Sequence, residues 1–175
     1  ARLGAESDVG LDAAETDALV AQLANTPAPA PSSASGSSGS GGVTRSDIRS
    51  AGKGIEVHVD IVDNVRRLLA DAAADGVDLA GGGYRDSAAQ IATRRNNCGT
   101  STYAIYEMRS SQCRPPTARP GSSQHEQGKA IDFTHNGKLI RSRSGAGWNW
   151  LKANAANYGL FNLPSEPWHW SVNGR

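Results

Sequence analysis

Sixteen consecutive residues, 27–42, consist only of Pro, Ala, Ser and Gly. No side chain in this run is able to anchor a hydrophobic core. Such a composition is typical of a linker that is stiffer where Pro is frequent and a flexible coil where Ser and Gly dominate. The run therefore divides the chain, and we expect the folded domain in residues 43–175, which are enough to bury one core.

Residues 1–26 precede the linker. Residues 11–23 are rich in helix formers, and their apolar side chains cluster on one side, which predicts the end of a helical or coiled-coil arm that binds a helical partner. The segment is too short and too weakly apolar to fold alone, so a disordered tail is an equally good interpretation. Because the chain begins at Ala1 rather than Met, we expect a processed or excised piece that has lost any export signal.

The net charge of the chain does not indicate a particular class of binding partner. Its 18 Lys and Arg residues nearly balance its 17 Asp and Glu residues, which gives a formal net charge of +1. Nucleic-acid-binding domains are typically much more basic, and acidic solvating tails are much more acidic. The sequence also contains no run of 18 or more apolar residues, so we predict no membrane-spanning helix.

The spacing of apolar residues after the linker predicts both strands and helices. Residues 54–61 alternate apolar and polar side chains, as does a strand with one polar face. Residues 62–76 show helical spacing with a glycine at the stop position, and residues 148–158 are a second helix candidate that ends at Gly159. We therefore expect an α+β domain in which helices pack on a small, largely antiparallel sheet.

Cys98 and Cys113 are the only cysteines, and they lack the Cys-x-x-Cys spacing of zinc or redox sites. The favoured interpretation is one disulfide in an exported protein, which would stabilise the domain by about 3 kcal/mol in the chain-entropy model. The alternative is a pair of free buried thiols in a cytosolic protein. The composition of the linker favours export.

Two segments contain the residue types of a metal-dependent hydrolase. Residues 123–132 (SQHEQGKAID) and 166–170 (EPWHW) together supply two imidazoles and one carboxylate for a metal, and a further carboxylate three residues before the second imidazole. A catalytic zinc has three protein ligands, an open position for water and a nearby base. Lys129 stands where a His-Glu-x-x-His motif starting at His125 needs its second histidine, so that motif is absent.

Local periodicity indicates how the first segment folds. Alternation over residues 129–134 predicts a strand that turns Asp132 away from the core. Gly128 allows the preceding chain to turn, so that His125 meets Asp132. A helix would also bring residues seven apart onto one face, but a glycine inside it costs about 1 kcal/mol. We therefore expect a loop followed by a strand.

The second segment requires an irregular backbone. Glu166 and His169 are three residues apart, which places them on opposite faces of a regular strand. Pro167 interrupts the ladder, so we expect Glu166 to reach the site from a loop or bulge that leads into the strand. Trp168 and Trp170 flank His169 and face away from it, where each is able to pack in the core or to form a substrate wall.

In combination, these motifs resemble those of a known family. The pattern Ser-x-His-x-x-Gly-x-Ala-x-Asp followed by Glu-x-Trp-His is similar to that of the VanY-type zinc D-Ala-D-Ala carboxypeptidases, which trim bacterial cell-wall stem peptides. The resemblance covers residues 54–170 and includes Gly-Tyr-Arg at 83–85, Gln90 and the run at 150–159. It implies the hedgehog/DD-peptidase fold, a small antiparallel sheet with packed helices and a zinc site on the sheet face.

The resemblance also implies a role for each matching residue. The expected zinc ligands are His125, Asp132 and His169. Glu166 would be the general base, and Arg85 would contact the substrate and the developing oxyanion. The expected substrate contacts are Ser123, Gln90, Tyr84 and Trp168.

Asp86 departs from the family pattern, which commonly has Ser or Thr after Gly-Tyr-Arg. A negative charge at this position either repels a substrate carboxylate or holds Arg85 in place. Lys129 replaces a residue that is usually apolar, which puts little in doubt.

The resemblance predicts an exported zinc metallopeptidase, secreted or associated with the bacterial cell wall, that releases D-Ala from stem peptides ending in D-Ala-D-Ala. The motifs define the reaction better than the cleavage site, so an L,D-carboxypeptidase and a peptidoglycan endopeptidase remain alternatives. A third alternative is a non-catalytic cell-wall binding domain of the same fold. Such a module needs neither Glu166 nor Arg85, so the presence of both favours an enzyme.

Overall fold

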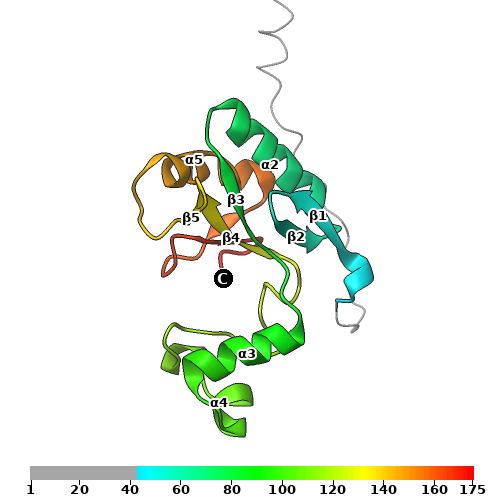
Figure 1. The fold of residues 1–175 in the computed structure, drawn as a ribbon, viewed down its shortest axis with the longest axis vertical. Coiled ribbons are helices and arrows are strands. Elements are labelled where there is room, and N and C mark those ends of the chain that lie inside the picture. Colours follow the sequence, from blue (N-terminus) through cyan, green and yellow to red (C-terminus); the bar gives the residue numbers. More distant parts are fainter. Residues whose placement is uncertain (1–42) are drawn as a thin grey trace, which may run out of the picture. The chain divides into compact units, whose positions relative to one another are not determined.

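The structure is a computed structural model that describes residues 43–175 (Figure 1). The predicted arm or tail at 1–26 and the predicted linker at 27–42 lie outside the described residues. Within the described part, no helix is long and apolar enough to cross a membrane. The elements, with η for 3-10 helices, run in the order η1 (Arg45–Asp47), β1 (Ile48–Gly52), β2 (Ile55–His58), α2 (Val62–Ala74), β3 (Leu79–Gly82), α3 (Ser87–Cys98), α4 (Thr102–Tyr106), η2 (Ser110–Gln112), β4 (Ala130–His135), β5 (Lys138–Leu139), α5 (Ala146–Asn154), η3 (Ala155–Tyr158), β6 (Phe161–Asn162) and β7 (His169–Ser171).

Antiparallel pairing builds both sheets. The larger sheet has the strand order β3-β4-β7-β6, and the short strand β5 pairs with β4. β1 and β2 form a separate two-stranded sheet. Every strand pair is antiparallel, which confirms the predicted α+β class with a small antiparallel sheet. β4 contacts three other strands and is the centre on which the site is built.

One apolar core joins the sheet to α2 and α5, which lie near each other in Figure 1. Ile131 and Phe133 of β4 are fully buried in this core. α2 contributes the buried face that its sequence periodicity predicts, and α5 contributes two tryptophans and a leucine. Gly76, at a φ of +75°, and Gly159, at a φ of +74°, follow the two predicted helices at their expected ends.

The predicted strand at 54–61 is shorter in the structure. β2 ends at His58, and the chain then turns, since Ile61 N–H donates to His58 O at 3.0 Å. His58 Nδ1 accepts from Asp60 N–H at 3.2 Å, which stabilises the same turn. Val59 is therefore exposed, although alternation predicts that it faces the core. A local side-chain to backbone contact overrides the strand pattern here.

Residues 87–124, which we call the lobe, contain α3 and α4 and lie away from α2 and α5 (Figure 1). We call residues 43–86 and 125–175 the body. No residue of the lobe belongs to the apolar core of the described residues. At the centre of the lobe is the fully buried guanidinium of Arg94, and the Sγ atoms of Cys98 and Cys113 lie 2.03 Å apart. The guanidinium donates to the backbone carbonyls of Ala104, Ile105, Met108 and Thr117.

Candidate metal centre and active-site cleft

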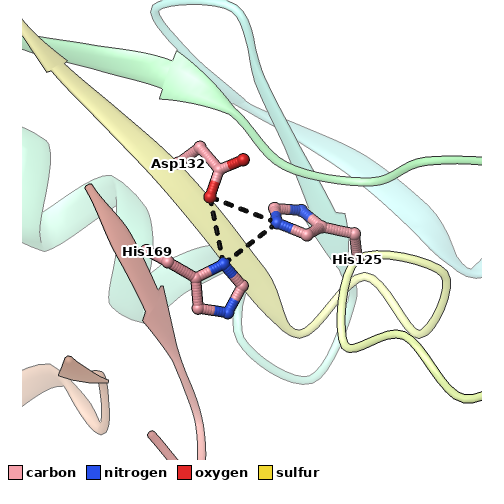
Figure 2. Close-up of side chains that lie close together, drawn as sticks. All are labelled: His125, Asp132 and His169. Atoms are coloured by element: carbon pink, nitrogen blue, oxygen red, sulfur yellow. Dashed lines mark hydrogen bonds and ion pairs between the residues drawn. The ribbon is translucent and has the colours of Figure 1, made fainter. Parts of the chain in front are cut away.

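Cross-strand register brings Asp132 and His169 together. Alternation along β4 buries Ile131 and Phe133 and turns Asp132 to the opposite face, which confirms the predicted strand. His169, the first residue of β7, stands directly opposite Asp132 in the β4–β7 ladder. Directly opposed residues of an antiparallel pair project from the same face. Their side chains therefore meet, with His169 Nδ1 3.0 Å from Asp132 Oδ1 (Figure 2).

A tight turn before β4 carries the second imidazole. Gly128 has a φ of +63°, and its N–H donates to His125 O at 3.0 Å. A Cβ at Gly128 would also lie only 2.7 Å from His58 N, so glycine is needed for the close approach to β2. The turn brings His125 Nε2 within 3.2 Å of Asp132 Oδ1 (Figure 2). The predicted loop before the strand is confirmed.

Backbone carbonyls determine which nitrogen of each imidazole carries a proton. His125 Nδ1 donates to Gly83 O at 2.7 Å, and His169 Nε2 donates to Arg175 O at 3.0 Å. Because a carbonyl oxygen only accepts, both outer nitrogens carry hydrogen. In the neutral rings the inner nitrogens, His125 Nε2 and His169 Nδ1, therefore present lone pairs to each other across 3.2 Å. Asp132 Oδ1 adds a third acceptor to the same point.

Three converging acceptors are stabilised by a cation between them. The donor atoms of His125, Asp132 and His169 all lie within 4.8 Å of one another. Atoms about 2.0–2.1 Å from a tetrahedral zinc are about 3.3–3.4 Å apart, close to the spacing in this cluster. Two imidazoles and one carboxylate are ligands that zinc prefers, and three ligands leave one position open. The outer hydrogen bonds to carbonyls orient the rings as metal-bound histidines require. The residues thus fit a catalytic zinc ion.

Charge coupling within the cluster shifts the pKa of two of its groups. Burial of Asp132 opposes its ionised form, but the His125 and His169 imidazoles donate hydrogen bonds to it when they are protonated, which outweighs burial and holds the pKa of this carboxyl well below its usual range. Burial of His169 disfavours its charged form, yet the Asp132 carboxylate outweighs burial and raises the pKa of the imidazole. Protons and a metal ion would therefore compete for the same imidazole lone pairs.

Glu166 lies on a turn that leads into β7. Its N–H donates to Leu163 O at 3.0 Å, and its carbonyl accepts from His169 N–H at 3.1 Å. This turn brings Glu166 to the cavity that contains His169, although a regular strand would separate them. Burial is the largest cause that raises the pKa of Glu166; the imidazoles oppose the shift, and Asp132 adds to it. A carboxyl with a raised pKa is suited to accept a proton and return it near neutral pH.

Two cavities adjoin the metal-binding residues, and they share Arg85, His125 and Asp132 in their linings. One has a volume of about 440 Å³ and the other of about 530 Å³. An extended peptide laid across the donor atoms is therefore able to occupy both cavities. The 440 Å³ cavity is lined from the body by Glu166, Trp168 and His169, and from the lobe by Gln90, Thr93 and Ser123.

Arg85 is held at the junction of the cavities. Its Nη1 donates to Gln90 Oε1 at 3.0 Å, and its Nη2 lies 3.9 Å from Asp132 Oδ2. Gln90 is fully buried, and its Nε2 donates to Ala118 O at 2.8 Å. Both the oxygen and the nitrogen of the Gln90 amide are thus hydrogen-bonded within the protein, and the oxygen holds the Arg85 guanidinium in place.

The other predicted substrate contacts divide between the two cavities. Ser123 and Trp168 line the 440 Å³ cavity with Glu166, whereas Tyr84 lines only the 530 Å³ cavity. Trp170 is 4% exposed and packs in the core, with its ring centroid 5.5 Å from that of Trp148. Of the two tryptophans beside His169, Trp168 is therefore the one at the cleft.

Asp86 caps the first turn of α3. Its Oδ1 accepts from Ala89 N–H at 2.7 Å, the contact expected of an N-cap aspartate. Among the hydrogen bonds and ion pairs of residues 43–175, none joins Asp86 to Arg85. The expectation that Asp86 holds Arg85 in place is therefore wrong for the described residues, because Gln90 takes that part.

Sequence reasoning missed two charged residues that are buried in the structure. Glu126 is only 9% exposed, and Arg94 is fully buried. Both sit among polar and charged neighbours in the sequence, a context that normally indicates a solvated face. Only the folded contacts distinguish them from surface charges.

Solved structures share this fold. The LdcB LD-carboxypeptidase is 22% identical with a TM-score of 0.55, over 74% of this chain and 69% of that one. The D,D-pentapeptidase VanY of a VanB-type vancomycin resistance cassette, solved with Zn(II), is 23% identical with a TM-score of 0.52, over 73% and 79%. VanYB in complex with D-alanine-D-alanine is 22% identical with a TM-score of 0.52, over 72% and 78%. These likenesses confirm the predicted fold.

A family model agrees with the fold and with the motifs. A search of curated proteins finds no match. The model of VanY, D-alanyl-D-alanine carboxypeptidase, matches residues 54–175. This match covers well over half of the chain and includes His125, Asp132, Glu166 and His169. The chain therefore belongs to the VanY family of D-alanyl-D-alanine carboxypeptidases.

Proposed function

We propose that the protein is an exported Zn²⁺ metallopeptidase that releases the terminal D-Ala of peptidoglycan stem peptides. The observation that carries this proposal is the convergence of three lone pairs, from His125, Asp132 and His169, at a cleft that also contains Glu166 and Arg85. Membership of the VanY family supports the reaction type. The similar VanY structure is a complex with Zn(II), which supports the metal. The similar VanYB structure is a complex with D-Ala-D-Ala, which supports the substrate class.

The proposed reaction assigns one task to each group. His125, Asp132 and His169 would hold zinc, which would supply Lewis-acid chemistry at the scissile carbonyl and lower the pKa of an attacking water. The Glu166 carboxylate takes the proton from that water and returns it to the amine nitrogen that leaves. The Arg85 guanidinium donates hydrogen bonds to the oxygen on which negative charge develops. Gln90 orients Arg85 through the 3.0 Å hydrogen bond between them.

The substrate lies, in this proposal, across both cavities. Ser123 and Trp168 contact the part of the peptide in the 440 Å³ cavity, and Tyr84 contacts the part in the 530 Å³ cavity. Because both cavities are lined by His125 and Asp132, longer stems and cross-links are alternative substrates. The likeness to the LdcB LD-carboxypeptidase also favours an L,D-carboxypeptidase as the second candidate.

We also propose that the protein acts outside the cytoplasm, where its substrate lies. The Sγ atoms of Cys98 and Cys113 at bonding distance support this location, because disulfides persist in oxidising compartments. A mass measurement of the exported protein with and without reduction tests the bond.

The reaction is tested by mass spectrometry of the products from a stem pentapeptide ending in D-Ala-D-Ala, with a chelated sample beside the zinc-loaded one. We expect loss of one D-Ala, abolished by chelation. In Glu166→Ala, kcat should fall about 10²–10⁴-fold with zinc still bound, because only the proton carrier is removed. Glu107→Ala, an exposed carboxylate in the lobe, serves as the control. Full activity in a zinc-loaded Glu166→Ala protein would contradict the assignment.

A further inference from the structure

We propose that Glu126 is a positioning residue that fastens the lobe to the turn carrying His125, and so sets the substrate wall of the cleft. The inference rests on the function proposed above, because it concerns how that site holds its substrate. Glu126 takes no part in the proposed reaction, yet it is a buried carboxylate within the segment that carries the metal ligand.

The Glu126 carboxylate binds three separate points of the lobe. Its Oε2 accepts from Gly121 N–H at 2.8 Å and from Ser123 N–H at 3.4 Å. Its Oε1 accepts from the Ser87 hydroxyl at 3.2 Å. Ser87 is the first residue of α3, whereas Gly121 and Ser123 lie on the loop that closes the lobe. One side chain of the body thus joins both ends of the lobe.

Hydrogen bonds, rather than a counter-ion, satisfy this carboxylate. Among residues 43–175, no Lys, Arg or His nitrogen lies within 4.0 Å of Glu126. A buried ionised carboxylate is costly unless its oxygens are satisfied, and the positive end of the α3 helix dipole adds to its stabilisation. The carboxylate is therefore satisfied only while the lobe is in place, which couples the lobe position to this residue.

The imidazole of the metal ligand is held by the body, and the lobe contacts His125 only through its backbone, where Ser123 Oγ accepts from His125 N–H at 3.2 Å. His125 Nδ1 is held by Gly83 O at 2.7 Å, and His125 O accepts from Arg85 N–H at 3.1 Å. Both partners belong to the body. In contrast, Ser123 and the α3 residue Gln90 reach the cleft only through the lobe. Loss of the Glu126 contacts should therefore move the substrate wall and leave the three donor atoms where they are.

The test compares Glu126→Ala with Glu126→Gln. In the amide, the oxygen can still accept from the loop N–H groups and the NH₂ can donate to Ser87 Oγ, so all three contacts are retained. For Glu126→Ala we expect KM for the stem pentapeptide to rise about 10-fold, with the zinc Kd within about 2-fold of wild type. Amide hydrogen exchange at Gly121 and Ser123 should be faster in Glu126→Ala than in Glu126→Gln.

Two controls separate positioning from simple loss of stability. Glu107→Ala removes an exposed lobe carboxylate, and Ser101→Ala removes the α4 N-cap, whose Oγ accepts from Ala104 N–H at 3.1 Å. The Ser101 variant should lower lobe stability without raising KM. The inference is overturned if Glu126→Ala matches Glu107→Ala in KM and exchange, or if zinc affinity falls in step with KM. Wild-type protein that neither binds zinc nor cleaves would instead refute the proposed function, while the exchange comparison would still test the contacts.

Discussion

The interior of the body and the interior of the lobe are stabilised by different kinds of contact. The body has a continuous apolar core that includes Phe133, Leu68 and Trp170. The lobe contributes no residue to that core, and at its centre four backbone carbonyls surround the guanidinium of Arg94. Burial of apolar area is non-directional and tolerates repacking, whereas a hydrogen-bonded polar centre is stable only when every partner is present.

This difference coincides with a division of labour at the cleft. The three donor atoms, Glu166 and Arg85 all come from the body, and the lobe supplies the facing wall. The geometry that binds a metal therefore depends on apolar packing, and the fit of the substrate depends on polar contacts. Changes that displace the lobe wall of the cleft should weaken substrate binding before they weaken metal binding.

The largest effect is expected from Arg94→Met, which keeps the bulk of the side chain and removes all its donors. The four carbonyls would lose their partner in a buried setting, so we expect the lobe to lose about 3–5 kcal/mol of stability. Amide hydrogen exchange should show the lobe unfolding while β4 and β7 stay protected.

Arg94→Lys sharpens the same experiment. Lysine keeps the charge but has one nitrogen in place of the planar guanidinium, so it cannot reach all four carbonyls. The stability of the lobe in Arg94→Lys should therefore lie between those of wild type and Arg94→Met. Equal loss of protection in the lobe and in β4 would contradict the division between the two regions.

The second prediction concerns the proposed disulfide between Cys98 and Cys113. Replacing Cys98 with Ser and Cys113 with Ala opens a loop with a sequence separation of 15, which should cost the lobe about 3 kcal/mol. We expect KM to rise while the zinc Kd stays near that of wild type, measured by chelator competition. Reduction of the wild-type protein should give the same pattern. A parallel loss of zinc would show that the lobe also controls the metal site.

Sequence patterns predicted the body better than the lobe. Alternation placed Asp132 on the open face of a strand, and Pro167 correctly placed Glu166 on irregular backbone before β7. These features depend on residues that are two to four positions apart, and such spacings can be read directly from a sequence. The strand predicted at 54–61 was too long, because the His58 to Asp60 contact forms a turn that periodicity does not encode.

The lobe and its contacts could not be predicted in the same way. Nothing in the spacing around Arg94 or Glu126 indicates burial, because each is satisfied by backbone groups far along the chain. Backbone groups carry no sequence identity, so hydrogen bonds to them leave no pattern. Gln90 illustrates this limit: it lines the 440 Å³ cavity, but nothing in the spacing predicts that its amide binds Arg85 and Ala118 O.

The third prediction tests the body through Tyr158, whose hydroxyl donates to Asp71 Oδ2 at 2.5 Å. Burial and this hydrogen bond raise the pKa of Tyr158 to about 12 from its usual value of about 10. A raised pKa in the folded state means that the stabilisation is complete below about pH 10 and is lost as pH rises toward 12. Tyr158→Phe should therefore cost about 1–2 kcal/mol at pH 8 and remove the tyrosine contribution to the alkaline loss of stability. Urea unfolding of wild type and Tyr158→Phe at pH 8 and pH 10.5 measures the loss of stability and its pH dependence. An unchanged pH dependence would contradict the assignment.

The smallest effect is expected at Asp86, where the lobe joins the body. Asp86→Ala removes the α3 N-cap and should cost about 1 kcal/mol, whereas Asp86→Asn keeps an equally good cap and should cost only a few tenths. The asparagine variant thus removes the charge while preserving the helix. Because Asp86 is exposed and its carboxylate is engaged by Ala89 N–H, screening should limit its effect on a bound peptide. We therefore expect KM for the pentapeptide to change less than about 2-fold in Asp86→Asn. A clear fall in KM in this variant alone would show that Asp86 repels the substrate carboxylate, and would make the start of the lobe a determinant of stem-peptide choice.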